Sequence, residues 1–193
     1  MKRLCGWIVI LGLLAPVAVA AQVATPAPAS PALSRAETLD RLFARLRQAE
    51  DADSAQRVEQ NILNLLRKSG SPTGDLLLQQ AISALAANQY DAALDILDTL
   101  VDQYPEFTEA VNQRATVYYL LGDYDRSAAD IAEVLAAEPR HFGALAGLGL
   151  VRQGQGRELE ALKAFRDALA VHPRMTGARN AADELAAKLE KQI

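Results

Sequence analysis

Few residues in this 193-residue sequence are of the types that perform chemistry. It contains two histidines, His141 and His172, and a single cysteine, Cys5. Each histidine stands near a proline and has neither a cysteine nor a second histidine at the spacing of metal ligands, which argues against a zinc site. We interpret both histidines as surface residues of turns. The sequence therefore predicts no metal and no cofactor.

The acidic and glycine-rich segments do not form a catalytic pattern either. Asp123 and Asp125 lie close together, but no apolar residues surround them to raise a pKa, so we interpret them as turn and cap residues. The glycines between residues 143 and 149 lie inside a predicted helix and do not follow a strand, which indicates helix packing instead of phosphate binding. The sequence has no nucleophile elbow and no dinucleotide fingerprint. We do not expect an enzyme.

The charge balance narrows the choice of partner. The chain has 20 Lys and Arg residues against 24 Asp and Glu residues, which gives a formal net charge of −4. Nucleic acids and anionic membrane surfaces are bound by clusters of basic residues, and the sequence has no such cluster. We therefore expect no nucleic-acid partner, and we expect another protein as the partner.

The N-terminal segment 1–21 has the features of a secretory signal peptide. Two basic residues precede an apolar run, and Ala18-Val19-Ala20 is a small-x-small site for signal peptidase. Cleavage after Ala20 or Ala21 would leave a periplasmic or secreted chain without cysteine and without a stable membrane insertion. An uncleaved membrane anchor is the alternative. A lipid anchor is not expected, because Cys5 precedes the apolar run.

Residues 22–33 are rich in alanine and proline. Pro26, Pro28 and Pro31 are spaced so that no helix can form across them, which predicts an extended linker. A proline-rich ligand for another module is the alternative, although no recognisable docking motif is present.

An internal repeat in the sequence predicts the secondary-structure elements that would position a functional site. Pro105, Pro139 and Pro173 recur at one constant interval, and each closes a stretch with the same order of apolar, small and turn-forming positions. The apolar positions are Leu77, Val111 and Leu145, then Leu97, Ile131 and Phe165, and the small positions are Ala93, Ser127 and Ala161. A fixed period of this length indicates stacked units, each of which buries its apolar face only against its neighbours.

The periodic residues also carry a resemblance. Leu148-Gly149, Tyr118, Ala93, Ala161, Phe165 and the three prolines resemble the tetratricopeptide pattern, from which Gln80, Ala84, Arg114 and Arg152 depart. The resemblance implies an all-α solenoid of stacked antiparallel helix pairs. It places three motifs within residues 73–175, at 74–107, 108–141 and 142–175.

Further helices are predicted on both sides of the repeats. Residues 34–72 predict a helical hairpin that begins with a capping box formed by Ser34 and Glu37, and we interpret it as a cap or a degenerate repeat. Residues 176–193 predict a helix with one narrow apolar stripe, which is typical of the cap of a solenoid.

The resemblance implies a non-enzymatic protein-interaction module with a groove along the first helices of its repeats. Proteins of this family hold an extended peptide or a partner helix there. In this sequence the implied floor of the groove consists of Leu78, Ile82, Leu85, Asn112, Gln113, Thr116, Tyr119, Gly143, Ala146, Gly147, Leu150 and Gln153.

The chemistry of this floor favours an apolar ligand. The family's clamp for a C-terminal carboxylate needs Lys, Arg and Asn, but the matching positions hold Leu78, Ile82, Gln113, Gly143 and Gly147. A hydrophobic peptide or an amphipathic helix fits such a floor better. The N-terminal hairpin could equally cover the groove. We expect an adaptor of the bacterial cell envelope, and the alternative is a structural component that self-associates through the alanine-rich C-terminal helix.

Overall fold

The computed structural model describes residues 33–191. The predicted signal peptide and residues 22–32 of the predicted linker lie outside the described residues. Within the described range the chain forms nine α-helices and no strand. Their bounds are α1 Arg35–Arg47, α2 Ala52–Leu66, α3 Pro72–Ala86, α4 Tyr90–Gln103, α5 Thr108–Leu120, α6 Tyr124–Ala137, α7 Phe142–Gly154, α8 Glu158–Val171 and α9 Thr176–Glu190.

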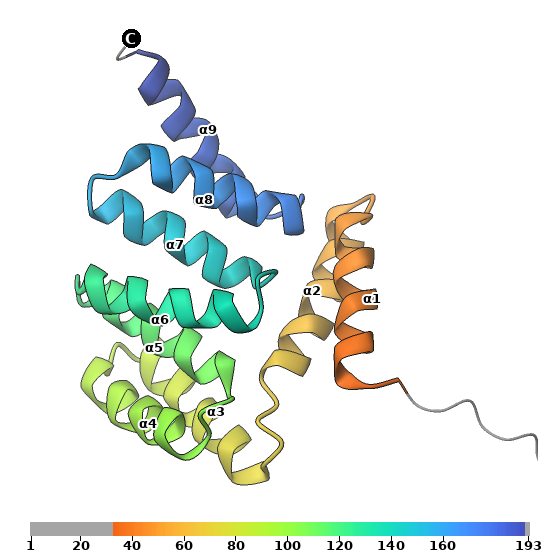
Figure 1. The fold of residues 1–193 in the computed structure, drawn as a ribbon, viewed down its shortest axis with the longest axis vertical. Coiled ribbons are helices and arrows are strands. Elements are labelled where there is room, and N and C mark those ends of the chain that lie inside the picture. Colours follow the sequence, from red (N-terminus) through yellow and green to blue (C-terminus); the bar gives the residue numbers. More distant parts are fainter. Residues whose placement is uncertain (1–32, 192–193) are drawn as a thin grey trace, which may run out of the picture. The chain divides into compact units, whose positions relative to one another are not determined.

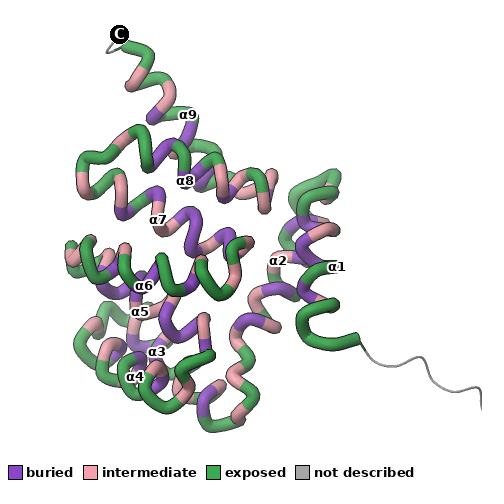
Figure 2. The backbone as a smooth tube through the Cα atoms, in the orientation of Figure 1, coloured by how far each residue is buried: buried purple, intermediate pink, exposed green. Residues whose placement is uncertain are grey.

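From α3 onward each helix packs mainly on the helices before and after it. The pairs α3/α4, α5/α6 and α7/α8 follow one another as antiparallel units, and α9 packs on α8 (Figure 1). Buried residues lie along the helix faces that meet within this stack (Figure 2). The predicted all-α solenoid of helix pairs is confirmed. Among the described residues, no helix combines the length and the apolar character that a membrane crossing requires.

The turn within each pair repeats in conformation as well as in sequence. Asn88, Gly122 and Gly156, which occupy the same position in successive repeats, have φ values of 59°, 76° and 72°. The following amide donates to a carbonyl five residues back in each case, as Asp123 N does to Tyr118 O at 2.9 Å. Glycine and asparagine adopt this left-handed conformation more readily than other residues, so the residue type at this position favours the end of each first helix.

The small positions of the repeat lie where the paired helices approach most closely. Ala93 and Ala161 have no exposed surface, and Ser127 donates its hydroxyl to the carbonyl of Ala115 at 2.7 Å. On the facing helix of the third pair, a Cβ added to Gly149 would lie 2.6 Å from the ring of Phe165. Small residues on both helices are therefore required for the pair to close.

The predicted N-terminal hairpin forms as α1 and α2. The capping box at its start is confirmed, because Ser34 Oγ accepts from Glu37 N at 3.2 Å and the Glu37 carboxylate accepts from Ser34 N. Its C-terminal boundary differs from the prediction. Pro72 does not end the hairpin but is the first residue of α3, with Ser71 as its N-cap, because a proline in the first helical turn forfeits no hydrogen bond.

The α9 helix buries only one stripe, formed by Ala178, Ala182 and Leu185. Asp183 stands one repeat length after Gly149, at the position where a first helix meets its second, and it is exposed. A charged residue replaces the small residue that close helix pairing needs. The outer face of α9 is therefore suited to solvent, as a capping helix requires.

Candidate binding cleft between α5 and α7

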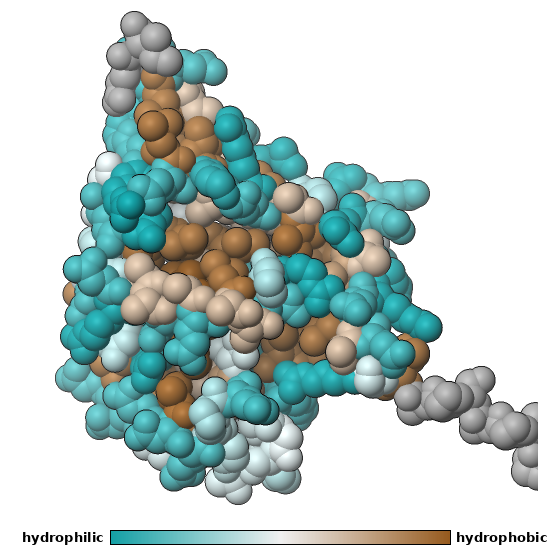
Figure 3. Space-filling model, in the orientation of Figure 1, coloured by the Kyte–Doolittle hydropathy of each residue, from teal (hydrophilic) through white to brown (hydrophobic). Residues whose placement is uncertain are grey.

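A small cleft lies on the first helices of the second and third pairs. The volume of this cleft is ≈ 60 Å³. On the face of the molecule drawn in Figure 3, apolar residues gather in the middle, at the level of α6 and α7. The lining comes from α5, α6 and α7 and consists of Asn112, Ala115, Thr116, Tyr119, Ser127, Ile131, Gly143, Ala144, Gly147 and Leu150. None of these residues carries a charge.

Three of the four polar side chains of the cleft, those of Asn112, Thr116 and Ser127, form hydrogen bonds within the chain. Ser127 donates to the carbonyl of Ala115, and Thr116 Oγ1 donates to the carbonyl of Asn112 at 3.0 Å. The Asn112 amide donates to the carboxylate of Glu109 at 3.4 Å. The cleft therefore offers mainly apolar atoms to a ligand.

Gly147 differs from the other helical glycines of the repeats in having room for a side chain. A Cβ there would meet only Ile131 Cδ1, at an ordinary contact distance of 3.6 Å. Gly154 is required by the Tyr124 ring, which would lie 2.5 Å from its added Cβ, just as Gly149 is required by Phe165. Glycine inside a helix costs about 1 kcal/mol relative to alanine. Packing within the chain does not account for Gly147, and its missing side chain keeps the cleft open.

The predicted groove floor is only partly assembled. Asn112, Thr116, Tyr119 and Leu150 lie together in the cleft with Gly143 and Gly147 of α7. Their role in binding stays a prediction.

The other predicted floor residues lie elsewhere. Two placements were wrong: Leu78 is 1% exposed in the core between α3 and α4, and Ala146 is buried in the core under α8. Gln113 donates to Glu109 at 2.7 Å. Ile82 and Leu85 pack half-buried against the first pair, and Gln153 is exposed outside the cleft.

The N-terminal hairpin contributes no residue to the cleft lining. Its core instead extends to Phe142 at the start of α7, Val171 at the end of α8 and Met175 at the N-cap of α9. Arg140 fixes the contact, because its guanidinium pairs with Asp40 at 2.7 Å and lies 4.5 Å from the ring centroid of Phe43. The hairpin therefore packs against the helix ends next to the turns between pairs and leaves this cleft uncovered.

The expected surface position of both histidines was wrong. His141 and His172 are 1% and 3% exposed. His141 Nδ1 accepts from Ala144 N at 3.1 Å, so its proton lies on Nε2 and is donated to the buried carboxylate of Glu109 at 3.0 Å. The period could have revealed this burial, because His141 stands one repeat length from both Phe107 and Met175. It occupies an apolar position of the repeat with a polar partner supplied by α5.

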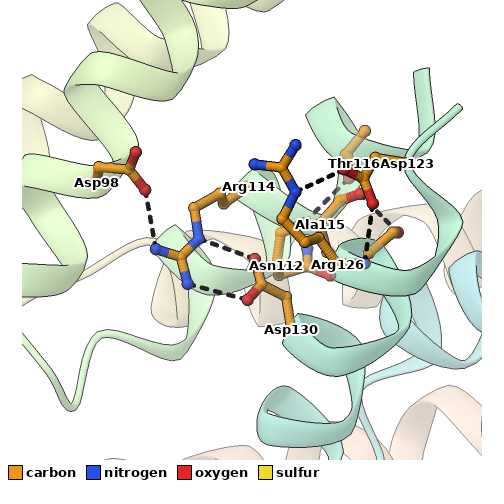
Figure 4. Close-up of polar contacts among 9 residues, drawn as sticks. Asp98, Asn112, Arg114, Ala115, Thr116, Asp123, Arg126 and Asp130 are labelled. Atoms are coloured by element: carbon orange, nitrogen blue, oxygen red, sulfur yellow. Dashed lines mark hydrogen bonds and ion pairs between the residues drawn. The ribbon is translucent and has the colours of Figure 1, made fainter. Parts of the chain in front are cut away.

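Arg114, a departure from the family pattern, joins three helices. Its guanidinium donates to both carboxylate oxygens of Asp130 on α6, at 2.8 and 2.9 Å, and to Asp98 on α4 at 2.9 Å (Figure 4). The hydrogen bonds to Asp130 raise the pKa of Arg114 further above its usual value, against the effect of burial. This ion network has a structural role, and it replaces apolar packing at the usual leucine position. Among residues 33–191, no group of three His, Cys, Asp or Glu side chains is arranged to hold a metal ion.

Comparison with known proteins identifies the repeats. The family model described as tetratricopeptide repeat matches residues 78–139 and 112–176, which together extend over just over half of the chain. The chain belongs to the tetratricopeptide repeat family. Such repeats mediate protein–protein interaction through extended binding surfaces and are generally not enzymes.

Two relatives are similar to this tetratricopeptide repeat protein over most of its length. A TPR repeat-containing protein of Rhizobium etli is 37% identical over 153 residues, which cover 79% of this chain and 75% of that protein. Small glutamine-rich tetratricopeptide repeat-containing protein 2 of Saccharomyces cerevisiae is 26% identical, and the match covers 65% of this chain and 36% of that protein.

Solved structures share the fold of this tetratricopeptide repeat protein. The Sgt2 TPR domain from Aspergillus fumigatus superposes with a TM-score of 0.60 at 20% identity, covering 63% of this chain and 82% of that chain. The first TPR of Spaghetti (RPAP3), bound to the HSP90 peptide SRMEEVD, gives a TM-score of 0.58 at 20% identity over 61% of this chain and 93% of that chain. MamA RS-1 covers 82% of this chain and 86% of that chain with a TM-score of 0.56 at 16% identity.

Proposed function

We propose that this tetratricopeptide repeat protein is a non-enzymatic adaptor of the bacterial cell envelope that holds a segment of a partner protein in the cleft between α5 and α7. The observation that carries the proposal is the open, uncharged cleft, in which Ser127 and Thr116 form hydrogen bonds within the chain and most of the lining is apolar. A neighbouring structure of the same fold binds a peptide, SRMEEVD, which supports peptide binding as the mode.

The ligand is expected to be apolar and not an acidic C-terminus. Capture of a carboxylate needs cations or amides that face the ligand. The matching positions include Leu78, which is buried, and Gln113, whose amide donates to Glu109 within the chain. The glycines at 143 and 147 contribute no donor side chain. The lining of the cleft therefore offers no cation to pair with a terminal carboxylate.

The envelope location rests on the N-terminal sequence. Two basic residues, an apolar run and Ala18-Val19-Ala20 support export and cleavage. The test is to express the whole chain in a bacterium, fractionate the cells and sequence the N-terminus of the product. We expect a periplasmic or secreted protein that begins at Ala21 or Gln22, and a cytosolic protein that retains Met1 would contradict the location.

Self-association through α9, the second function considered, receives less support. Ala178 and Ala182, which gave that helix its alanine-rich stripe, are buried within the chain. Light scattering at micromolar concentration separates the two functions, because a monomer is expected for an adaptor and a stable oligomer for a structural component.

The adaptor function is tested by affinity capture from detergent-solubilised envelopes with a matched pair of variants. Leu150 lines the cleft and is 39% exposed, whereas Leu159 lies on α8 and is 72% exposed. We expect Leu150→Glu to lose partners that both the wild-type protein and Leu159→Glu retain. Identical sets of captured proteins from all three would contradict binding in the cleft.

A further inference from the structure

We propose, on the basis of the proposed function, that the occupant of the cleft is an amphipathic helix of a partner protein. The helix would insert one leucine-sized aliphatic side chain beside Gly147 and place a basic residue two turns further along, next to Asp125. The proposal rests on the volume of the cleft, on the glycine that keeps it open, and on the exposed leucines of α5 and α7 with the acidic Asp125 of α6 beyond them.

The volume of the cleft fits a single aliphatic side chain. A space of roughly 10 to 15 Å³ on this measure holds one water molecule, so ≈ 60 Å³ accommodates about four heavy atoms. That number matches the side chain of leucine or isoleucine, each of which has four carbon atoms. Sites for small-molecule ligands are usually about 300 to 1,000 Å³, so a free metabolite or cofactor does not fit this site.

Gly147 indicates where along α7 the aliphatic side chain of the partner helix would insert. Room for a Cβ exists beside Ile131, so an alanine would be tolerated there and would stabilise the helix. An alanine methyl group would also occupy part of the cleft. Gly147 therefore exchanges helix stability for open space, which serves an occupant from outside the chain.

Exposed apolar residues continue from the cleft in one direction. Leu150 follows Gly147 by three residues on α7, and Leu120 follows Thr116 by one turn on α5, with exposures of 39% and 48%. A helix with apolar side chains three or four residues apart presents them on one face, which matches this spacing. An apolar peptide helix can therefore contact the cleft and the two leucines together.

An acidic group stands beyond these leucines. Gln155 lies eight residues after Gly147, about 12 Å along the helix axis, and its amide donates to the carboxylate of Asp125 at 3.0 Å. Asp123 beside it is paired with Arg126, whereas no cation among the described residues pairs with Asp125. A Lys or Arg about two turns from the anchor residue would complement this charge.

The test uses a displayed library of random peptides, each long enough for about four helical turns, in a helical host scaffold and selected on the full-length protein. We expect enriched sequences with an aliphatic residue and a Lys or Arg two turns away. Binding should fall about tenfold or more for Gly147→Leu and severalfold for Gly147→Ala. It should be unchanged for Leu159→Glu, and Asp125→Asn should remove only the preference for the basic residue.

Three results would overturn the proposal. They are a selection without binders, enriched peptides whose affinity is the same for wild type and Gly147→Ala, and enrichment of peptides with an acidic C-terminus. The Gly147→Ala variant guards against misfolding, because its melting temperature is expected to rise. If envelope partners still depend on Leu150 while selected peptides ignore Gly147, the adaptor function stands and the helix anchor is wrong.

Discussion

The same substitution should have different effects on stability at two glycines that lie two residues apart in α7. At Gly147 a new Cβ meets only Ile131, at 3.6 Å, whereas at Gly149 it would lie 2.6 Å from the Phe165 ring. We expect Gly147→Ala to stabilise the protein and Gly149→Ala to be neutral or destabilising. Both positions lie well inside the helix Phe142–Gly154, so the intrinsic gain in helix propensity is the same for the two variants.

The expected change in the free energy of unfolding of each variant is the sum of a helix-propensity contribution and a packing contribution. Alanine is favoured over glycine by about 1 kcal/mol in a helix interior, which applies to both variants. Phe165 is 2% exposed and its ring would have to shift to admit the new Cβ, so overpacking at position 149 costs about 1 to 3 kcal/mol. The free energies of unfolding of the two variants should therefore differ by about 1 to 3 kcal/mol, and the propensity term cancels in that difference.

The assay is urea unfolding followed by far-ultraviolet circular dichroism of the helices. Tryptophan fluorescence is unsuitable because the only tryptophan, Trp7, lies in the predicted signal peptide. The midpoint should rise for Gly147→Ala and should not rise for Gly149→Ala. Equal shifts in the same direction would refute the reasoning, since they would mean that the contact with Phe165 does not restrict position 149.

Two further predictions concern ionised groups. Arg114→Leu should lower the free energy of unfolding by about 1 to 3 kcal/mol, because the Asp130 side chain, 10% exposed, loses its partner. Urea unfolding measures this loss, and adding Asp130→Leu should recover part of it. If Arg114→Leu alone is as stable as wild type, the stabilising role of this ion network is contradicted. Burial of Asp75 opposes its ionisation, but hydrogen bonds from Ser69 N and Lys68 outweigh burial and lower its pKa. A lowered folded-state pKa adds stability that is present above the unfolded value of about 3.9 and is lost as the pH falls through the folded value. Melting curves from pH 6 to pH 2 should therefore show a smaller acid-induced loss for Asp75→Asn than for wild type, and identical losses would refute this linkage.

The repeat could be predicted from the sequence because its determinants are local and periodic. Helix pairs follow from apolar spacing, and the turns follow from residues that accept positive φ at positions 88, 122 and 156. The close crossings follow from small residues such as Ala93 and Ala161, which are fully buried. Each of these features depends on the type of a residue and its place in the period, so one sequence is sufficient.

The candidate site depended on contacts between segments far apart in the chain. Leu78 and Ala146 share the helical spacing of groove residues, but their neighbours in the stack bury them. His141 is buried because Glu109, 32 residues earlier, supplies its hydrogen-bond partner. The hairpin packs on Phe142 through residues about 100 positions away, as the Arg140–Asp40 ion pair shows.

The sequence by itself determined the all-α repeat, the length of each unit and the positions of its turns. Only the tertiary structure decided which residues of the first helices remain open to a ligand. The physical reason is that exposure at a helix face depends on the side chains of the adjacent unit, such as Ile131 beside Gly147 and Phe165 beside Gly149. Periodicity places both glycines on the same helix, and packing makes one a structural requirement and leaves the other open.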